Sequence, residues 1–109
     1  MTLTETEFTD EILKWAKVYG WRRFHVRGNT RRLIQGDVGF VDLVMVRPPR
    51  LVFAELKVGK GKTTPEQNDW LKALGLCRYD PMEDVASPIE VYVWRPEMWS
   101  EIHAVLSSK

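Results

Sequence analysis

Hydrophobic residues recur along the chain with two different spacings, and each spacing predicts a type of element. Apolar side chains three or four residues apart predict helices, whereas strict alternation predicts a half-buried strand. The predicted elements, in order, are a helix over residues 6–19, a strand over 21–26, two strands within 36–57, a helix over 65–75, a strand over 89–94 and a helix over 97–106. This order indicates a single α/β domain over residues 1–109.

Polar residues and glycines mark the expected ends of the first two helices. Thr6 or Thr9 could cap the first helix, and Gly20 lies where that helix should end. Thr64, followed by a proline, is a typical start for the second helix, and Gly75 marks its expected end. Between residues 76 and 88 we expect a loop that could hold one helical turn.

The stretch over residues 36–57 predicts a hairpin, because two β-branched runs flank a turn at 47–50 that contains two prolines. With this turn, Val46 should face Leu51, and counting back places Asp42 opposite Glu55. Residues two apart on a strand share a face, so Lys57 should lie beside Glu55.

Two carboxylates on directly opposed positions of an apolar sheet repel each other. They must either take a raised pKa or share a cation, and hard divalent ions such as Mg²⁺ prefer oxygen ligands. Asp42 and Glu55 with Lys57 therefore indicate a metal site beside a lysine. The alternative is a salt bridge between Lys57 and one of the two acids at a sheet edge.

Composition places the chain among ordinary globular domains. It has 109 residues, of which 44% are hydrophobic and 28% charged. No apolar run approaches the roughly 20 residues that span a bilayer, and the first residues lack the pattern of a signal peptide. A single cysteine, Cys77, excludes an internal disulfide, and we interpret it as a small buried residue. These features favour a reducing cytoplasm and no membrane partner.

The net charge of +1 is small, but its distribution is uneven. Basic residues gather in two stretches, which contain Arg22, Arg23, Arg27, Arg31 and Arg32, and Lys57, Lys60 and Lys62. Acidic residues gather elsewhere, at Asp80, Glu83, Asp84, Glu90 and Glu97. A basic face with an acidic back is expected of a phosphate-binding surface, although a charged stretch is more often only solvated.

Three further polar residues have two interpretations each. Glu7 and Glu11 could point toward the metal site, with Glu11 preferred, or could be surface acids near a helix N-terminus. Gln67 could complete a capping box with Thr64. It also shares a stripe with apolar residues that should face the sheet, which indicates a polar target beneath it.

Together these motifs resemble the VRR-NUC branch of the PD-(D/E)XK nucleases, in the short stand-alone form typical of bacteriophage and prophage. The matching residues are Gly20-Trp21 with Phe24-His25, Gly39-Phe40-Val41-Asp42-Leu43, Glu55-Leu56-Lys57, Gln67 with Trp70-Leu71, and Val93-Trp94-Arg95-Pro96. They cover nearly the whole chain in the right order. One departure is Val41, which stands where the family has a proline.

The resemblance implies a restriction-endonuclease-like α/β fold: a core of a helix, three strands, a helix and a strand, followed by a C-terminal helix, with a mixed sheet flanked by helices. It also implies a site for Mg²⁺ or Mn²⁺. Asp42 and Glu55 would bind the metal, with Glu11 and the Leu56 carbonyl as further ligands. Lys57 would be the catalytic lysine, and Gln67 the helix glutamine of the family.

The implied activity is metal-dependent endonucleolytic hydrolysis of DNA in the cytoplasm of a bacterial host cell. Candidates for contacts to the DNA backbone are Arg23, His25, Arg27, Arg31 and Lys60. Because no base-reading element is evident, we expect selection of DNA structure rather than of sequence. The resemblance to junction-cleaving enzymes of this size implies a four-way junction as the substrate and a symmetric homodimer. The alternatives are a non-catalytic DNA-binding or assembly subunit and a sequence-specific restriction-type endonuclease.

Overall fold

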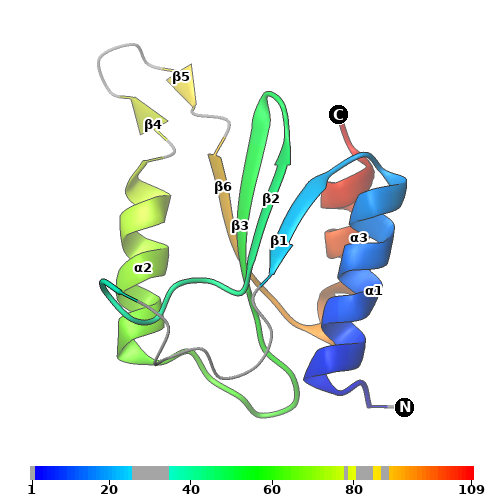
Figure 1. Ribbon diagram of the computed structural model, residues 1–109, viewed down its shortest axis with the longest axis horizontal. Coiled ribbons are helices and arrows are strands. Elements are labelled where there is room, and N and C mark those ends of the chain that lie inside the picture. Colours follow the sequence, from blue (N-terminus) through cyan, green and yellow to red (C-terminus); the bar gives the residue numbers. More distant parts are fainter. Residues whose placement is uncertain (1, 26–34, 78, 81–84, 87–88) are drawn as a thin grey trace.

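The computed structural model describes residues 2–25, 35–77, 79–80, 85–86 and 89–109. Its helices and strands, in chain order, are α1 (Glu5–Val18), β1 (Arg22–His25), β2 (Leu43–Arg47), β3 (Arg50–Leu56), α2 (Pro65–Leu76), β4 (Tyr79–Asp80), β5 (Val85–Ala86), β6 (Ile89–Trp94), the short 3₁₀ helix η2 (Pro96–Met98) and α3 (Trp99–Ser107) (Figure 1). No helix in this described part is long and apolar enough to cross a membrane.

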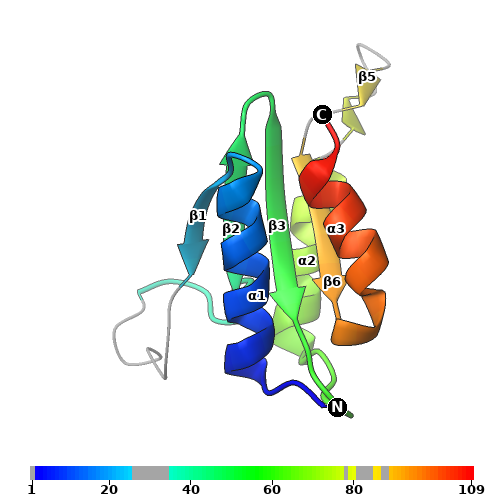
Figure 2. The same cartoon turned by 90° about the vertical axis from the view of Figure 1, so that its right-hand side faces the viewer.

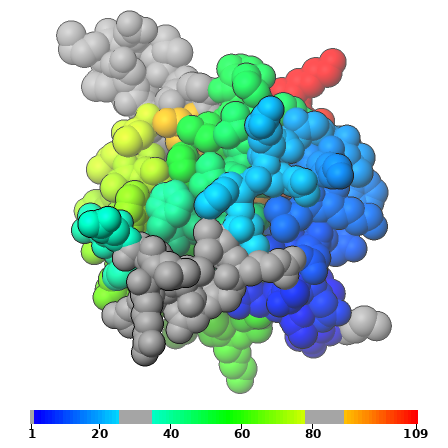
Figure 3. All heavy atoms as spheres, in the orientation of Figure 1, coloured from blue at the N-terminus to red at the C-terminus, as the bar shows by residue number. Residues whose placement is uncertain are grey.

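Four strands form the central sheet in the order β1-β2-β3-β6. The first three pair antiparallel, and β6 pairs parallel to β3 after the chain crosses over through α2. Helices α1 and α3 lie on one face of the sheet and α2 lies on the other (Figures 1 and 2). In the space-filling view, the edge strand β1 (cyan) lies at the surface next to α1 (blue) (Figure 3). The predicted mixed α/β sheet with flanking helices is confirmed.

The hydrophobic core lies between the sheet and the pair α1 and α3. The predicted apolar stripe of α1 is confirmed, since Phe8, Ile12 and Ala16 are completely buried. They pack with residues that alternate along the strands and with the inner side of α3: Leu43, Met45, Val52, Ala54, Leu56, Trp94, Ile102 and Leu106. Because successive strand residues face opposite sides, the residues between them point toward α2.

Two arginines that flank the hairpin turn hold the end of α3. Arg47 and Arg50 lie over the ring of Trp21, with guanidinium carbons 4.6 and 4.9 Å from its centroid. Arg47 Nη1 donates to the Leu106 carbonyl at 3.1 Å, and Arg50 Nη1 donates to the Ser108 carbonyl at 2.8 Å. The last carbonyls of a helix lack partners within it and carry its negative dipole end. These guanidinium groups therefore join the hairpin to the end of α3.

Several predicted boundaries were wrong at the helix ends. The cap of α1 is Thr4 rather than Thr6 or Thr9, because Thr4 and Glu7 exchange hydrogen bonds between each side chain and the other's backbone N–H. The hydroxyl of Thr9 is buried and donates to the Glu5 carbonyl instead. Helix α2 continues through Gly75 to Leu76.

The segment after α2 also differs from the prediction. It contains the short antiparallel strands β4 and β5 instead of a helical turn within its described part. Cys77 is exposed rather than buried, because it lies beyond the last turn of α2 as its C-cap. The last helix begins two residues later than predicted, since Pro96–Met98 forms the 3₁₀ turn η2. The predicted strand end at Val26 lies outside the described residues, as does most of the segment 27–35 that precedes the hairpin.

Glu90 supports the arginine pair from β6. Arg50 donates to both Glu90 carboxylate oxygens at 2.7 Å, and the Tyr92 hydroxyl donates to one of them at 2.6 Å. The hydrogen bonds from Arg50 lower the pKa of Glu90, with those from Tyr92 adding to the effect. A lowered carboxyl pKa adds stability above its unfolded pKa of 4.5, and this stability is lost as the pH falls through the folded pKa.

We therefore expect Glu90→Gln to lower the free energy of unfolding by about 1–2 kcal/mol near neutral pH, where a charge-assisted bidentate pair is lost. The difference from wild type should shrink as the pH falls below 4.5, as measured by urea denaturation across pH. Glu97→Gln, at an exposed position, is the control. An equal deficit at acidic and neutral pH would contradict this account.

Candidate functional site

The hairpin places two carboxylates side by side on the face toward α2. The register across the turn is as predicted, with Val46 opposite Leu51 and Leu43 opposite Ala54. Asp42 is the residue directly before β2, and its Oδ2 accepts a hydrogen bond from the backbone N–H of Leu56 at 2.9 Å. This bond attaches Asp42 to β3 beyond the end of the ladder.

Glu55 is the most deeply buried acid of the described chain, with 1% of its surface exposed. Its Oε1 accepts a hydrogen bond from Gln67 Nε2 at 2.8 Å and lies 3.5 Å from Lys57 Nζ. Its Oε2 is buried without a hydrogen-bond partner among the described residues. A buried carboxylate oxygen without a partner is costly, so the arrangement is incomplete as a purely structural ion pair.

Burial raises the pKa of Glu55 to about 8, from an ordinary value of 4.5. The neighbouring negative charge of Asp42 adds to this rise, and the ammonium of Lys57 offsets part of it. Without a further cation, the site therefore holds a proton at neutral pH. This is the behaviour expected of two carboxylates that share a space suited to positive charge.

Lys57 is held close to both the sheet and the acids. Its backbone N–H donates to the Trp94 carbonyl at 3.0 Å, so the pairing of β3 with β6 extends to it. Its side chain is 17% exposed, and its Nζ forms the ion pair with Glu55. The ion pair considered from the sequence is therefore present, next to the predicted pair of acids.

Gln67 performs both roles that the sequence left open. Thr64 caps α2, and its backbone N–H donates to Gln67 Oε1 at 2.9 Å. The other end of the same amide, Nε2, donates to Glu55. Because the cap needs the oxygen and the carboxylate needs the nitrogen, the two contacts together determine how the amide is oriented.

The comparisons with known proteins identify this arrangement of elements. No family model and no curated protein matches the sequence. A solved structure described as a "VRR_NUC domain protein" superposes with a TM-score of 0.58 at 19% identity, covering 97% of this chain and 92% of that one. The chain shares its fold with a VRR_NUC domain protein. The restriction-endonuclease-like class predicted from the sequence is thereby confirmed.

Within this VRR_NUC fold, the acids suit a hard divalent cation. Mg²⁺ is often bound by only one or two carboxylates, with water and substrate phosphate as its other ligands. Asp42 and Glu55 supply oxygens, and the partnerless Glu55 Oε2 is a vacant acceptor. The Leu56 N–H donates to Asp42. That the Leu56 carbonyl binds the metal stays a prediction.

Within the part of the chain that the structure describes, no third acid joins this pair. Among the described residues no group of three or more His, Cys, Asp or Glu side chains could hold a metal. Glu7 is bound to Thr4 in the helix cap. Glu11 lines a hollow of about 240 Å³ with Trp15, Trp99 and others, because α1 packs on the face of the sheet opposite α2 (Figure 2). The predicted contribution of Glu11 is therefore not supported in this arrangement.

The predicted DNA-contacting residues lie in different places. His25 Nδ1 is 2.9 Å from the Asp42 carbonyl oxygen, so His25 links the end of β1 to the backbone of Asp42, directly before β2. Arg23 Nη1 donates to the Leu13 carbonyl at 3.3 Å, and Lys60 is exposed after β3. Arg27 and Arg31 lie outside the described residues.

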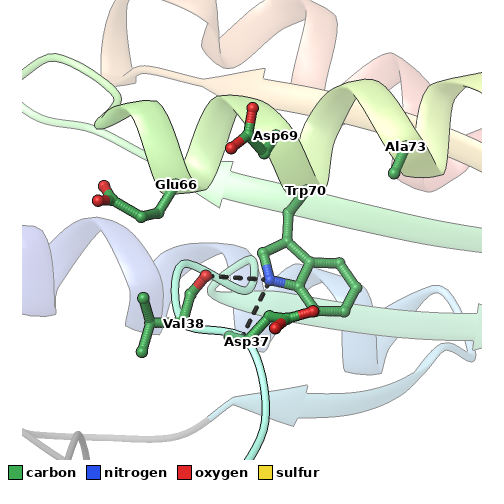
Figure 4. A pocket seen from close by; sticks show the side chains of 6 residues that line it. All are labelled: Asp37, Val38, Glu66, Asp69, Trp70 and Ala73. Carbon is green, nitrogen blue, oxygen red and sulfur yellow. Dashed lines mark hydrogen bonds between the residues drawn. The ribbon is translucent and has the colours of Figure 1, made fainter.

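Sequence reasoning missed the contact between α2 and the segment before Asp42. A hollow of about 400 Å³ lies here, lined by Asp37, Val38, Glu66, Asp69, Trp70 and Ala73 (Figure 4). Trp70 Nε1 donates to the Val38 carbonyl at 3.1 Å and also contacts that of Asp37 at 3.3 Å. Apolar periodicity places Trp70 against the sheet, but it carries no sign that the indole N–H binds a loop.

We expect the metal-free protein to lose stability as the pH rises from 4.5 toward 8. In this window the folded state keeps a proton on Glu55 that the unfolded chain releases. The isosteric Glu55→Gln should remove this dependence and exceed wild type by a few kcal/mol, in order of magnitude, at pH 8.

The measurement is urea denaturation with chelator at pH 5 and pH 8. Glu66→Gln, which removes an exposed carboxylate of α2, should keep the wild-type dependence. An identical pH dependence of stability in wild type and Glu55→Gln would contradict the raised pKa of Glu55.

Proposed function

We propose that this protein is a VRR-NUC nuclease that hydrolyses DNA phosphodiester bonds with Mg²⁺ or Mn²⁺. The observation that carries the proposal is the buried Glu55: one of its oxygens has no hydrogen-bond partner among the described residues, while Lys57 and Gln67 contact the other. A structural role would not need a buried acid that lacks a partner, whereas a cation site does. The fold shared with a VRR_NUC domain protein supports the same conclusion.

Asp42 and Glu55 would bind the divalent ion. When bound, such an ion lowers the pKa of a water ligand and neutralises charge that develops on the phosphate. The chain itself prepares the position, since Asp42 is held by the Leu56 N–H and Glu55 by the Gln67 amide. Both carboxylates therefore keep their positions before any ligand arrives.

Lys57 would act on the attacking water or the phosphate, and Gln67 on the Glu55 carboxylate. The ammonium of Lys57, 3.5 Å from Glu55, would donate a hydrogen bond that orients the attacking water, or donate to a phosphate oxygen as negative charge develops on it in the transition state. Gln67 keeps the Glu55 carboxylate turned toward the reaction, because its amide orientation is set by the helix cap. Fixed donors of this kind need no rearrangement as charge develops.

We further propose branched DNA, such as a four-way junction, as the preferred substrate. The exposed cations Arg23 and Lys60 offer contacts to phosphates, which position a duplex without reading its sequence. A junction has two equivalent strands to cut, so a symmetric homodimer would present one site to each. This dimer would form in solution and bind DNA as a unit.

Asp42→Asn, Glu55→Gln and Lys57→Ala should each lower cleavage by about a hundredfold or more, because each removes a group that acts in the transition state. Activity is measured on labelled four-way-junction, flapped and supercoiled DNA with Mg²⁺ and with Mn²⁺. Asp69→Asn and Lys72→Ala, at exposed positions of α2, are matched controls that should cleave like wild type.

The same assay separates the rival functions. Cleavage that survives all three substitutions would refute the mechanism. A chelator-insensitive gel shift with no cutting on any substrate would favour a non-catalytic DNA-binding subunit. Discrete bands from a plasmid digest would favour a sequence-specific endonuclease.

A further inference from the structure

Gly39 lies where the segment before Asp42 touches the first turn of α2. Its φ of +94° is a conformation that residues with a side chain rarely adopt. A Cβ built on Gly39 would lie 2.6 Å from the Glu66 carbonyl carbon and 2.8 Å from the Gln67 backbone nitrogen. Both are backbone atoms, so they cannot rotate away. Only a residue without a side chain fits here.

The peptide that Gly39 touches is the one that orients Gln67. The Gln67 N–H donates to the Thr64 hydroxyl at 3.1 Å, and the Gln67 side-chain oxygen accepts from the Thr64 N–H. This closed pair leaves Gln67 Nε2 aimed at Glu55, 2.8 Å away. A displacement of this turn would move the amide and its contact with the carboxylate together.

Neighbouring contacts show that the segment is attached to α2 along more than one turn. Phe40 packs edge-on against Trp70, with centroids 4.9 Å apart, and against Phe53 of β3 at 6.2 Å. Trp70 Nε1 donates to the carbonyls of Asp37 and Val38 (Figure 4). We call residues 37–41 the strap, because this segment, which leads into Asp42 and β2, packs across α2.

We propose that Gly39 is a positioning residue of the reaction: the absence of its side chain lets the strap lie directly on α2, which holds the Gln67 amide on Glu55 beside Asp42. This inference rests on the proposed nuclease function for its kinetic consequence. Whether the Gln67–Glu55 hydrogen bond depends on Gly39 can be tested even if the protein is not a nuclease.

The chain offers a closely matched control for substitution at Gly39. Gly36 also has a positive φ, +115°, so alanine there has the same type of backbone strain. A Cβ on Gly36 would meet nothing within 4 Å. Gly36→Ala therefore reports the cost of strain alone, and Gly39→Ala adds the collision with α2.

Gly39→Ala should push the strap and α2 apart by about 1 Å, the shift that restores ordinary carbon contacts. Because misplacement on this scale costs roughly tenfold to hundredfold in rate, kcat should fall by that factor while KM for DNA stays within about twofold. Gly36→Ala should keep kcat within about twofold of wild type.

A spectroscopic readout tests the positioning without any activity. The side-chain NH₂ signals of Gln67 in a ¹⁵N–¹H correlation spectrum, assigned by their loss in Gln67→Glu, report its hydrogen bond to Glu55. We expect these signals to move toward those of a free glutamine in Gly39→Ala and to stay in place in Gly36→Ala. Unchanged Gln67 signals in a folded Gly39→Ala would overturn the inference, whatever the kinetics.

A second variant covers the case in which Gly39→Ala does not fold. Trp70→Phe keeps an aromatic ring against Phe40 but removes the N–H that holds the strap carbonyls. It should move the Gln67 signals in the same direction, whereas Trp99→Phe, on the other side of the sheet, should not. Equal Gln67 signals in both tryptophan variants would also overturn the inference. A wild-type protein that cuts no DNA would refute the proposed function. The Gln67 signals would then be the test of whether Gly39 positions the Gln67 amide.

Discussion

A carboxylate buried on the central strand is the constraint on which the rest of the site depends. Glu55 lies on β3, which has a neighbouring strand on each side, so water cannot reach it from the sheet plane. Its negative charge must therefore be supported by groups that the fold itself supplies. The amide of Gln67 and the ammonium of Lys57 meet part of this need at Oε1. A bound cation is what we propose for Oε2, which has no partner among the described residues.

The part of this arrangement that the sequence predicts is the part governed by local rules. A turn at residues 47–50 and the period of two along a strand are enough to place Asp42, Glu55 and Lys57 on one face. The helix start at Thr64 is equally local, because its cap involves residues only three apart. Elements over residues 43–56 and 89–94 follow for the same reason.

What the sequence does not predict depends on how separate elements meet. The cap of α1 is the exception, because Thr4 and Glu7 form a capping box that is as local as the one at Thr64. Periodicity places Glu11 beside an apolar stripe, but the side of the sheet that receives α1 is a property of packing. The contact of Gly39 with α2 joins two segments whose closeness no local pattern records. Tertiary contacts thus set the details that distinguish this site.

The separations of these contacts along the chain suggest an order of assembly. The bonds that join Asp42 to β3 and Gln67 to Glu55 span 14 and 12 residues, whereas Trp21 Nε1 donates to the Leu106 carbonyl across 85 residues. Short loops close at a lower entropic cost than long ones, so we expect the hairpin to bring its acids together while much of the chain is still solvated. The acids face α2, which also carries Gln67, so we expect them to lose water when this helix docks, before α3 completes the opposite face of the sheet.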